Sequence, residues 1–425
     1  MNLKLRLVVM NFLQYYIWGA WLLTIGTWWF QTLHWSGTSF GAIFSTMGIA
    51  SLFMPSLAGI VADKWVNAER LYGLFHIIGA AVLLAISHAG NPQQMFWVVL
   101  LYMCFYMPTI SLAIAVAYNA LKQEGQDVVS TYPPIRVWGT VGFIAATWTT
   151  SLLGFKASAA QFHVAAGASL LLGLYAFTLP KCPPKLDAAH SRSVMDRLGL
   201  TSFVLFKNRN MAVFFIFAML LGAALQLTNA YGDAFLSDFV KVPAYANLLT
   251  VKYSTIIISI SQFSETAFIL TIPFFLKRFG IKAVMTMSML AWVLRFGLFG
   301  FGNPAGGLWM IVLSCIIYGM AFDFFNISGS LFVESQADPK IRASAQGLFM
   351  LMTNGVGAVL GSLIAGWMID RFFTNHACDD TAAICKDWHG IWLAFAGYSL
   401  VMAFLFVPLF RHKHQAQPLR VLPTH

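Results

Sequence analysis

Long apolar stretches separated by short polar segments dominate this sequence. They occur at 8–33, 40–62, 71–88, 94–119, 133–155, 160–180, 211–236, 254–276, 283–301, 305–333, 343–369 and 390–410. A helix that crosses a bilayer needs about 20 consecutive, mostly apolar residues. The pattern therefore predicts an all-α polytopic membrane protein with twelve transmembrane helices.

Composition supports this prediction and excludes a soluble fold. Hydrophobic residues make up 59% of the chain and charged residues only 10%, whereas soluble proteins carry about 25% charged residues. The net charge of +10 could suggest a nucleic-acid partner. The basic residues instead fall in short loops between apolar stretches, so we expect them to set topology and expect no nucleic acid to bind.

The distribution of Lys and Arg predicts the orientation. With both termini on the cytoplasmic side, most of the 26 basic residues lie in cytoplasmic segments. Outer loops would hold only Lys156, Lys241, Lys252, Arg371 and Lys386. Cytoplasmic loops are enriched in Lys and Arg. We therefore expect a multi-pass membrane protein with both termini in the cytoplasm.

The longest polar stretch divides the chain in two. It reads KCPPKLDAAHSRSVMDRLGL and falls between the sixth and seventh predicted helices. We expect residues 1–180 to form an N-terminal six-helix half and residues 181–210 a cytoplasmic linker. Residues 211–425 would form the C-terminal six-helix half with a short cytoplasmic tail.

Two short basic segments occupy matching places in the two halves. GIVADKWVNAERL follows the second predicted helix, and PFFLKRFGIKAVM follows the eighth. Gly59, Asp63 and Lys64 match the start of the loop motif of the major facilitator superfamily, which the chain resembles. The expected Gly-Arg is missing from the first copy, and Lys277 replaces the acid in the second. The resemblance implies the major facilitator fold, with its two pseudo-repeat halves.

Several longer segments resemble the bacterial nucleoside:proton symporter family within that superfamily. They are NFLQYYIWGAWL, ADKW, YMPTI, PPIRVWGTVGF, LQLTN, SQFSETAFILTIPFF, AFDFFNISGS and RASAQGLF. The resemblance runs almost end to end and implies secondary active transport of purine or pyrimidine nucleosides together with protons. It also implies a location in the bacterial inner membrane. We expect no cofactor and a monomeric protein, although the sequence leaves the oligomeric state open.

Asp323 is the most informative polar residue because it lies halfway along an apolar stretch. An ionisable residue inside a membrane span is costly and marks a functional hypothesis. Asp323, Asn326 and Ser330 share one helical face. We expect Asp323 to carry the coupling proton; the alternative is a structural partner for Arg136.

Glu265 and Arg136 are two further charged residues within predicted spans. Gln262 shares a face with Glu265, and their acceptors and donors suit ribose hydroxyls or a base edge. Thr140 and Phe143 follow Arg136 on one face. We expect all five to bind substrate, and Glu265 also to take part in proton coupling. The alternative for Glu265 and Gln262 is hydrogen bonding between helices. Arg136 could instead be a structural partner of Asp323 or Glu265, and Phe143 could be a core or lipid-facing residue.

The resemblance adds amides and aromatic rings to this set. Gln226 and Asn229 match positions where the family places amides that bind nucleoside, and Tyr318 and Phe322 could form an aromatic wall for the base. The alternative for each is helix packing.

Four other residues receive weaker expectations. Gln14 and Trp18 form a similar pair on the first helix. Arg295 should snorkel to the interface, and Asp233 lies near the outer end of the seventh helix. We expect Arg295 and Asp233 to be structural.

Two cysteines share an outer loop. Cys378 and Cys385 would face an oxidising compartment, so a disulfide is expected. His376 and His389 lie nearby, but no metal-ligand pattern supports a metal site there.

Other functions remain as alternatives at this stage. A proton symporter for another polar solute such as a sugar, a drug exporter, or a nucleoside-binding sensor would share these features. An enzyme is not expected, because no metal cluster, nucleophile elbow, Walker loop or dinucleotide turn occurs.

Overall fold

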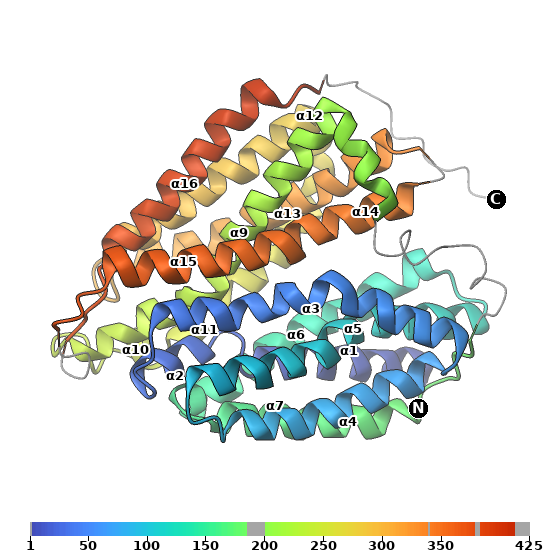
Figure 1. The fold of residues 1–425 in the computed structure, drawn as a ribbon, viewed down its shortest axis with the longest axis horizontal. Coiled ribbons are helices and arrows are strands. Elements are labelled where there is room, and N and C mark those ends of the chain that lie inside the picture. Colours follow the sequence, from blue (N-terminus) through green and yellow to red (C-terminus); the bar gives the residue numbers. More distant parts are fainter. Residues whose placement is uncertain (1, 185–199, 339–340, 379–382, 413–425) are drawn as a thin grey trace.

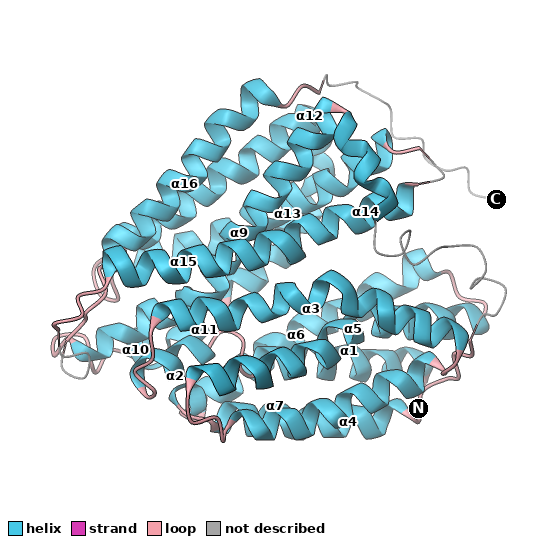
Figure 2. Ribbon diagram, viewed as in Figure 1, coloured by secondary structure: helices cyan, strands magenta, loops and turns pink. Residues whose placement is uncertain are grey.

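The structure is a computed structural model that describes residues 2–184, 200–338, 341–378 and 383–412. The expected linker falls partly outside these residues, as does most of the expected C-terminal tail. Within the described residues, regular secondary structure is helical, apart from one isolated β-bridge between Thr374 and Lys386 (Figure 2).

The first helix group comprises the helices up to residue 176. Its members are α1 (Leu3–Gly19), α2 (Ile25–Gln31), α3 (Gly37–Lys64), α4 (Ala68–Ile86), α5 (Pro92–Gln123), α6 (Val128–Leu152), the short 3-10 helix η1 (Phe155–Ala157) and α7 (Ala160–Ala176).

The second helix group comprises the remaining elements. They are η3 (Leu200–Lys207), α9 (Arg209–Asp238), η4 (Phe239–Lys241), α10 (Leu249–Lys252), α11 (Ser254–Ile258), α12 (Ile260–Phe301), α13 (Leu308–Gln336), α14 (Arg342–Met350), the π-helix η5 (Leu351–Gly357), α15 (Ala358–Phe373) and α16 (Trp388–Leu409).

The two groups form the two layers of the molecule. Figure 1 shows α1–α7 in the lower layer and α9 and α12–α16 in the upper one. The layers meet at the end where α2, α10 and α11 lie, and their ribbons diverge toward the end that carries the N-terminus. We call the former the closed end.

Eight of the described helices are long and apolar enough to cross a membrane. They include α3, α4, α5 and α16, whose bounds agree with the predicted spans to within a few residues. The described part of the chain is thus an all-helical protein built from membrane-spanning helices.

The predicted span 8–33 is not one continuous helix. It divides into α1 and α2, joined by turns over residues 20–24. The Thr24 hydroxyl donates to the Trp21 carbonyl and at 2.7 Å to Gln161 Oε1. Such side-chain bonds to the backbone compete with the regular helical ladder.

Two other predicted spans contain local irregularities. The predicted break between spans 254–276 and 283–301 coincides with a kink in α12 at Gly280, which is non-helical with φ 78°, and the first of these spans begins with the short α11. Glycine adopts this left-handed backbone without steric cost. The span 343–369 contains η5, a π-helical stretch, between α14 and α15.

Glycines allow α3 and α15 to pack closely between the two groups. The backbones of Gly41 and Gly366 approach so closely that a Cβ on Gly366 would lie 2.9 Å from the Gly41 Cα, and a Cβ on Gly41 would collide with the Ser362 carbonyl. Asp370 accepts from the Gly37 and Thr38 amides, each at 2.8 Å. Because these amides begin α3, the carboxylate caps the helix from across the interface.

Candidate functional site

α13 presents Asp323 in the interior of the second helix group. The side chain is only 4% exposed, and its Oδ2 atom has no hydrogen-bond partner. α12 approaches α13 at Gly319, whose amide bonds to Ser264 Oγ at 3.1 Å; a Cβ there would lie 2.5 Å from the Ser264 carbonyl. Because Glu265 follows Ser264 on α12, this close approach also brings Glu265 toward α13.

Glycines on α6 bring α1 against Arg136. A Cβ on Gly139 would lie 2.6 Å from the Tyr15 ring and 2.8 Å from Arg136 Nη1, and Gly142 meets the Phe12 carbonyl. The guanidinium carbon of Arg136 lies 4.0 Å from the centroid of the Tyr15 ring. Stacking on an aromatic face suits a planar cation in a site of low polarity.

Charged side chains from the two helix groups interact electrostatically. Arg136 acts electrostatically on Glu265, and Glu265 acts on Asp323 and on the hydroxyl of Tyr318. Among the described residues, however, no ion pair joins Arg136 to either acid. The permanent charge of Arg136 therefore lies close enough to act on Glu265, but it forms no described salt bridge with Glu265 or Asp323.

Three of the predicted site residues have a buried side-chain oxygen with no hydrogen-bond partner. These oxygens are Gln226 Oε1 on α9, Gln262 Oε1 on α12 and Asp323 Oδ2 on α13. Buried polar atoms in proteins are nearly always hydrogen-bonded. Three orphan acceptors on neighbouring helices are thus suited to a polar ligand that donates hydrogen bonds.

Tyr318 and Phe322 form an aromatic platform on α13. Their rings are stacked with centroids 5.8 Å apart and planes tilted by only 5°. A small cavity of about 10 Å³ borders Phe322, Asn326 and Trp292. This volume is near the minimum for one water molecule, so the platform is packed on this side.

Arg295 lies beneath this platform, and the expectation that it snorkels to the interface is wrong. Its side chain is 0% exposed, and its guanidinium carbon lies 4.6 Å from the centroid of the Tyr318 ring. Nη1 donates to the Ser314 carbonyl at 2.7 Å. The residue is held inside the group by a carbonyl and aromatic rings, because α9, α12 and α13 enclose it.

The other predicted site residues make no described contact with the two acids, and some of them pack inside the first group. Thr140, Phe143 and Asn229 are half-buried on α6 and α9, and no described side-chain contact joins them to the acids. Gln14 turns away into the first group, where its Oε1 accepts from Tyr72 at 2.7 Å. Its neighbour Trp18 packs edge-on against Tyr106.

Asp233 joins the two groups at the closed end. Its carboxylate accepts from Ser254 at 2.6 Å and from Thr255 at 2.8 Å, both on α11. It also accepts from Thr27 of α2 at 2.5 Å. Because Thr27 belongs to the first group, this bond crosses the interface.

Lys156 adds a cation to the same cluster. Its ammonium donates to Ser254 at 2.8 Å and to Ser237 at 3.0 Å, and both hydroxyls also bond to Asp233. Burial lowers the pKa of Lys156, and the Asp233 carboxylate opposes this effect. We call Thr27, Lys156, Asp233 and Ser254 the closed-end latch.

A loop of the second group also reaches the first at this end. Cys378 and Cys385 are joined by a disulfide, as expected, with Cα atoms 5.6 Å apart. The next residue, Lys386, pairs with Thr374 and places its ammonium 4.2 Å from the centroid of the Phe30 ring on α2. Among the described residues, no group of three or more His, Cys, Asp or Glu could hold a metal ion.

Two residues near the site had no assigned role in the sequence. Tyr15 stacks on Arg136, and Trp292 packs edge-on against Tyr318 with centroids 6.0 Å apart. Aromatic residues are frequent in this chain, so composition gave no reason to select these two. An Arg inside a span needs a partner, which is the one signal that could have directed attention to Tyr15.

A family model described as nucleoside H+ symporter matches residues 1–415 of the chain. The chain is 52% identical over 421 residues to the xanthosine permease of Escherichia coli (strain K12), covering 99% of each chain. It is 49% identical over 419 residues to the nucleoside permease NupG of the same organism, covering 98% of each.

The fold agrees with these sequence relationships. A crystal structure of the nucleoside transporter NupG, as a D323A mutant, matches with a TM-score of 0.92 at 49% identity. The match covers 96% of this chain and 100% of that one.

Proposed function

The chain belongs to the nucleoside H+ symporter family, and on this premise we propose that Asp323 and Glu265 handle the proton beside a nucleoside site. The protein is a transporter and not an enzyme, and its activity is proton-coupled nucleoside uptake. The observation that carries the assignment of residues is the meeting of Arg136, Glu265 and Asp323 beside unpaired buried oxygens.

We propose that the ribose and base dock against polar groups from both helix groups. The unpaired oxygens of Gln226 and Gln262 would accept from ribose hydroxyls or base N–H groups. Arg136, which cannot lose its charge, would donate to a base carbonyl. Asn229 and Thr140 would complete the hydrogen bonds of the substrate.

Aromatic groups would hold the base. Tyr318 and Phe322 offer a stacked pair, and Phe143 would contact the base from the first group. Arg295 supports Tyr318 from the buried side at 4.6 Å, which holds the platform in place. Flat aromatic faces pack well against a planar base and are tolerant of its identity.

Asp323 suits proton coupling because its protonation state decides what it can bind. The ionised carboxylate only accepts hydrogen bonds, and the protonated form also donates one. A ligand shifts a conformational equilibrium only through different affinities for the two states. Proton exchange at Asp323, assisted by Glu265, would therefore change both substrate affinity and the preferred conformation.

We propose that the chain has twelve membrane-spanning helices in two six-helix halves, residues 1–180 and 211–425, joined by the linker 181–210. The turn at Gly280 supports counting α12 as two crossings, and α1, α6 and α7 would supply the others. Because both halves belong to one chain, a monomer would suffice for transport. Alternating access would rock the halves about the site.

We also propose that the closed end faces the outside of the bacterial inner membrane and that both termini are cytoplasmic. The bias of Lys and Arg supports this orientation, and so does the disulfide, since disulfides persist in oxidising compartments. Reporter fusions after Asn91 and after His425 would test it. A periplasmic reporter should be active only at Asn91, and the reverse pattern would refute the orientation.

The test of the site is uptake of radiolabelled uridine and xanthosine in bacteria without their own nucleoside carriers. Wild type should accumulate nucleoside, and a protonophore should abolish accumulation. Asp323→Asn should lose accumulation but retain exchange of internal for external nucleoside, because the amide keeps the shape but cannot carry the proton. Normal accumulation by Asp323→Asn would refute the assignment and move it to Glu265. Binding without any accumulation by wild type would favour a sensor, and competition by sugars would favour another solute.

A further inference from the structure

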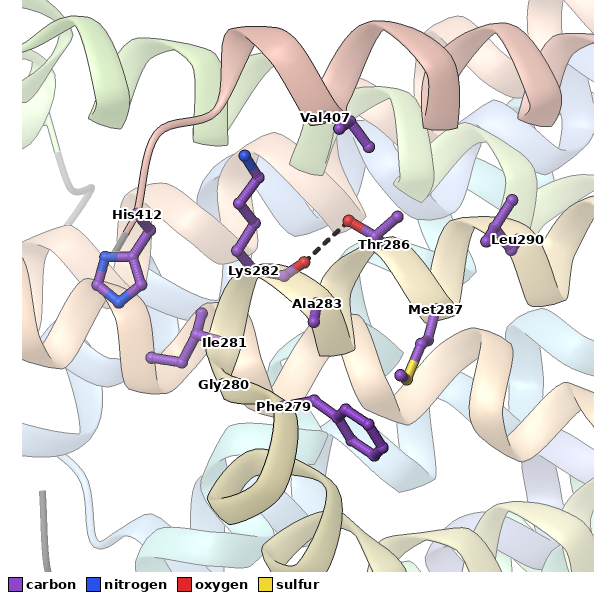
Figure 3. A pocket seen from close by; sticks show the side chains of 10 residues that line it. All are labelled: Phe279, Gly280, Ile281, Lys282, Ala283, Thr286, Met287, Leu290, Val407 and His412. Carbon is purple, nitrogen blue, oxygen red and sulfur yellow. Dashed lines mark hydrogen bonds between the residues drawn. The ribbon is translucent and has the colours of Figure 1, made fainter. Parts of the chain in front are cut away.

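The turn inside α12 opens a cavity that the transport site does not use. The cavity has a volume of about 490 Å³ and lies between α12 and the last turn of α16 (Figure 3). Gly280, with φ 78°, forms its floor, and Val407 and His412 line it from α16 and the residues after it. Its volume lies in the usual range of small-molecule sites, roughly 300–1,000 Å³.

One end of this cavity is basic. Figure 3 shows Lys282 and His412 on the same side of the cavity, with Leu290 at the opposite end. None of the described residues that line it is acidic.

The other end of the cavity is apolar and open to the membrane. Leu290 is 49% exposed and Val407 is 46% exposed, and Met287 and Ala283 lie between them and the basic end. Leu290 follows Gly280 by ten residues, which corresponds to about 15 Å at the α-helical rise of 1.5 Å per residue. This length is about half of the roughly 30 Å hydrocarbon core, which is one leaflet.

A site with a basic end and an apolar wall one leaflet long fits an amphiphile with an anionic head. Soluble anions would match the charge but not the wall, and neutral lipids would match the wall but not the charge. Basic pockets between transmembrane helices on the cytoplasmic side are suited to anionic headgroups. We propose that this cavity binds one anionic phospholipid, with its phosphate at Lys282 and an acyl chain along Leu290 and Val407.

Native mass spectrometry of the purified full-length protein tests this proposal. The probes are phosphatidylglycerol and phosphatidylcholine with identical acyl chains, together with glycerol 3-phosphate. We expect one tightly retained phosphatidylglycerol per chain and no comparable retention of the other two probes. Equal retention of phosphatidylcholine, or binding of glycerol 3-phosphate as tight as that of phosphatidylglycerol, would overturn the proposal.

Three variants separate the site from general surface charge. Lys282→Gln should weaken phosphatidylglycerol binding roughly tenfold, as expected for loss of one charge-assisted contact. Ala283→Phe should block binding while all charges remain. Lys122→Gln is the matched control, because this exposed Lys lies in the last turn of α5 and does not line the cavity.

Unchanged binding by both Lys282→Gln and Ala283→Phe would refute the site. Equal loss in Lys122→Gln would show that phosphatidylglycerol responds to the overall charge instead. Nucleoside exchange by each variant reports whether it is folded, and it is measured independently of the lipid.

Discussion

The bond between Thr27 and Asp233 allows the closed-end latch to be tested with one small substitution. Thr27→Val keeps the shape of the side chain and removes its hydroxyl, which donates to the carboxylate at 2.5 Å. Asp233 keeps its bonds to Ser254 and Thr255, so the second group is left intact. The substitution therefore removes this bond and the longer one to Ser237 Oγ at 3.3 Å, both of which exist only while the two groups meet at this end.

The expected magnitude follows from the chemistry of that bond. A hydrogen bond to a charged group contributes about 1.5–3 kcal/mol, and each 1.4 kcal/mol changes an equilibrium about tenfold. Loss of the bond should therefore shift the balance away from the closed arrangement by about 10- to 150-fold. Thr24→Val is the matched control, because its hydroxyl bond to Gln161, 2.7 Å long, lies within the first group.

Distances between spin labels measure this balance directly. Gln93 and Ala244 are exposed positions near the closed end, one in each group, and labelling without cysteine chemistry leaves the disulfide intact. In the wild type the short distance should dominate, and in Thr27→Val a longer distance should gain population. An unchanged distribution, or an equal change in Thr24→Val, would refute the latch.

Two further predictions follow from the same end of the molecule. Gly41→Ala should disfavour the closed arrangement by about 1–3 kcal/mol through overpacking, which the same label distances would detect. Gly59→Ala on the same helix has no atom within 4 Å of its added Cβ and should leave them unchanged. Cys378→Ser should lower the free energy of unfolding by about 2 kcal/mol, as expected for a short disulfide loop. Reductant should lower the thermal midpoint of the wild type and of Cys104→Ser, but not that of Cys378→Ser.

The sequence predicted those features that depend on local composition. The lengths of the apolar stretches predicted most helix bounds. A segment that crosses the bilayer must satisfy its backbone hydrogen bonds as a helix, and the side chains along it are mostly apolar. The burial of Asp323 followed from its central place in such a run. The pairing of Cys378 with Cys385 followed from their shared loop.

The features that the sequence did not predict depend on contacts between distant segments. Arg295 is enclosed because three helices meet around it, and no local pattern shows which helices those are. The bond between Thr27 and Asp233 joins residues more than 200 positions apart. The break between α1 and α2 falls inside one apolar stretch, so run length alone predicted one helix where two occur.

The charges inside the bundle restrict how a neutral nucleoside can be coupled to a proton. Arg136 and Arg295 keep their charges under all conditions, whereas Glu265 and Asp323 can each take a proton. The four groups sum to zero only when both acids are ionised, so each bound proton leaves a net positive charge in a medium of low polarity. A neutral nucleoside cannot compensate that charge. On the proposed mechanism, coupling must therefore arise from hydrogen bonding: a protonated Asp323 donates to the substrate, and an ionised one competes with Gln226 and Gln262 for its donors.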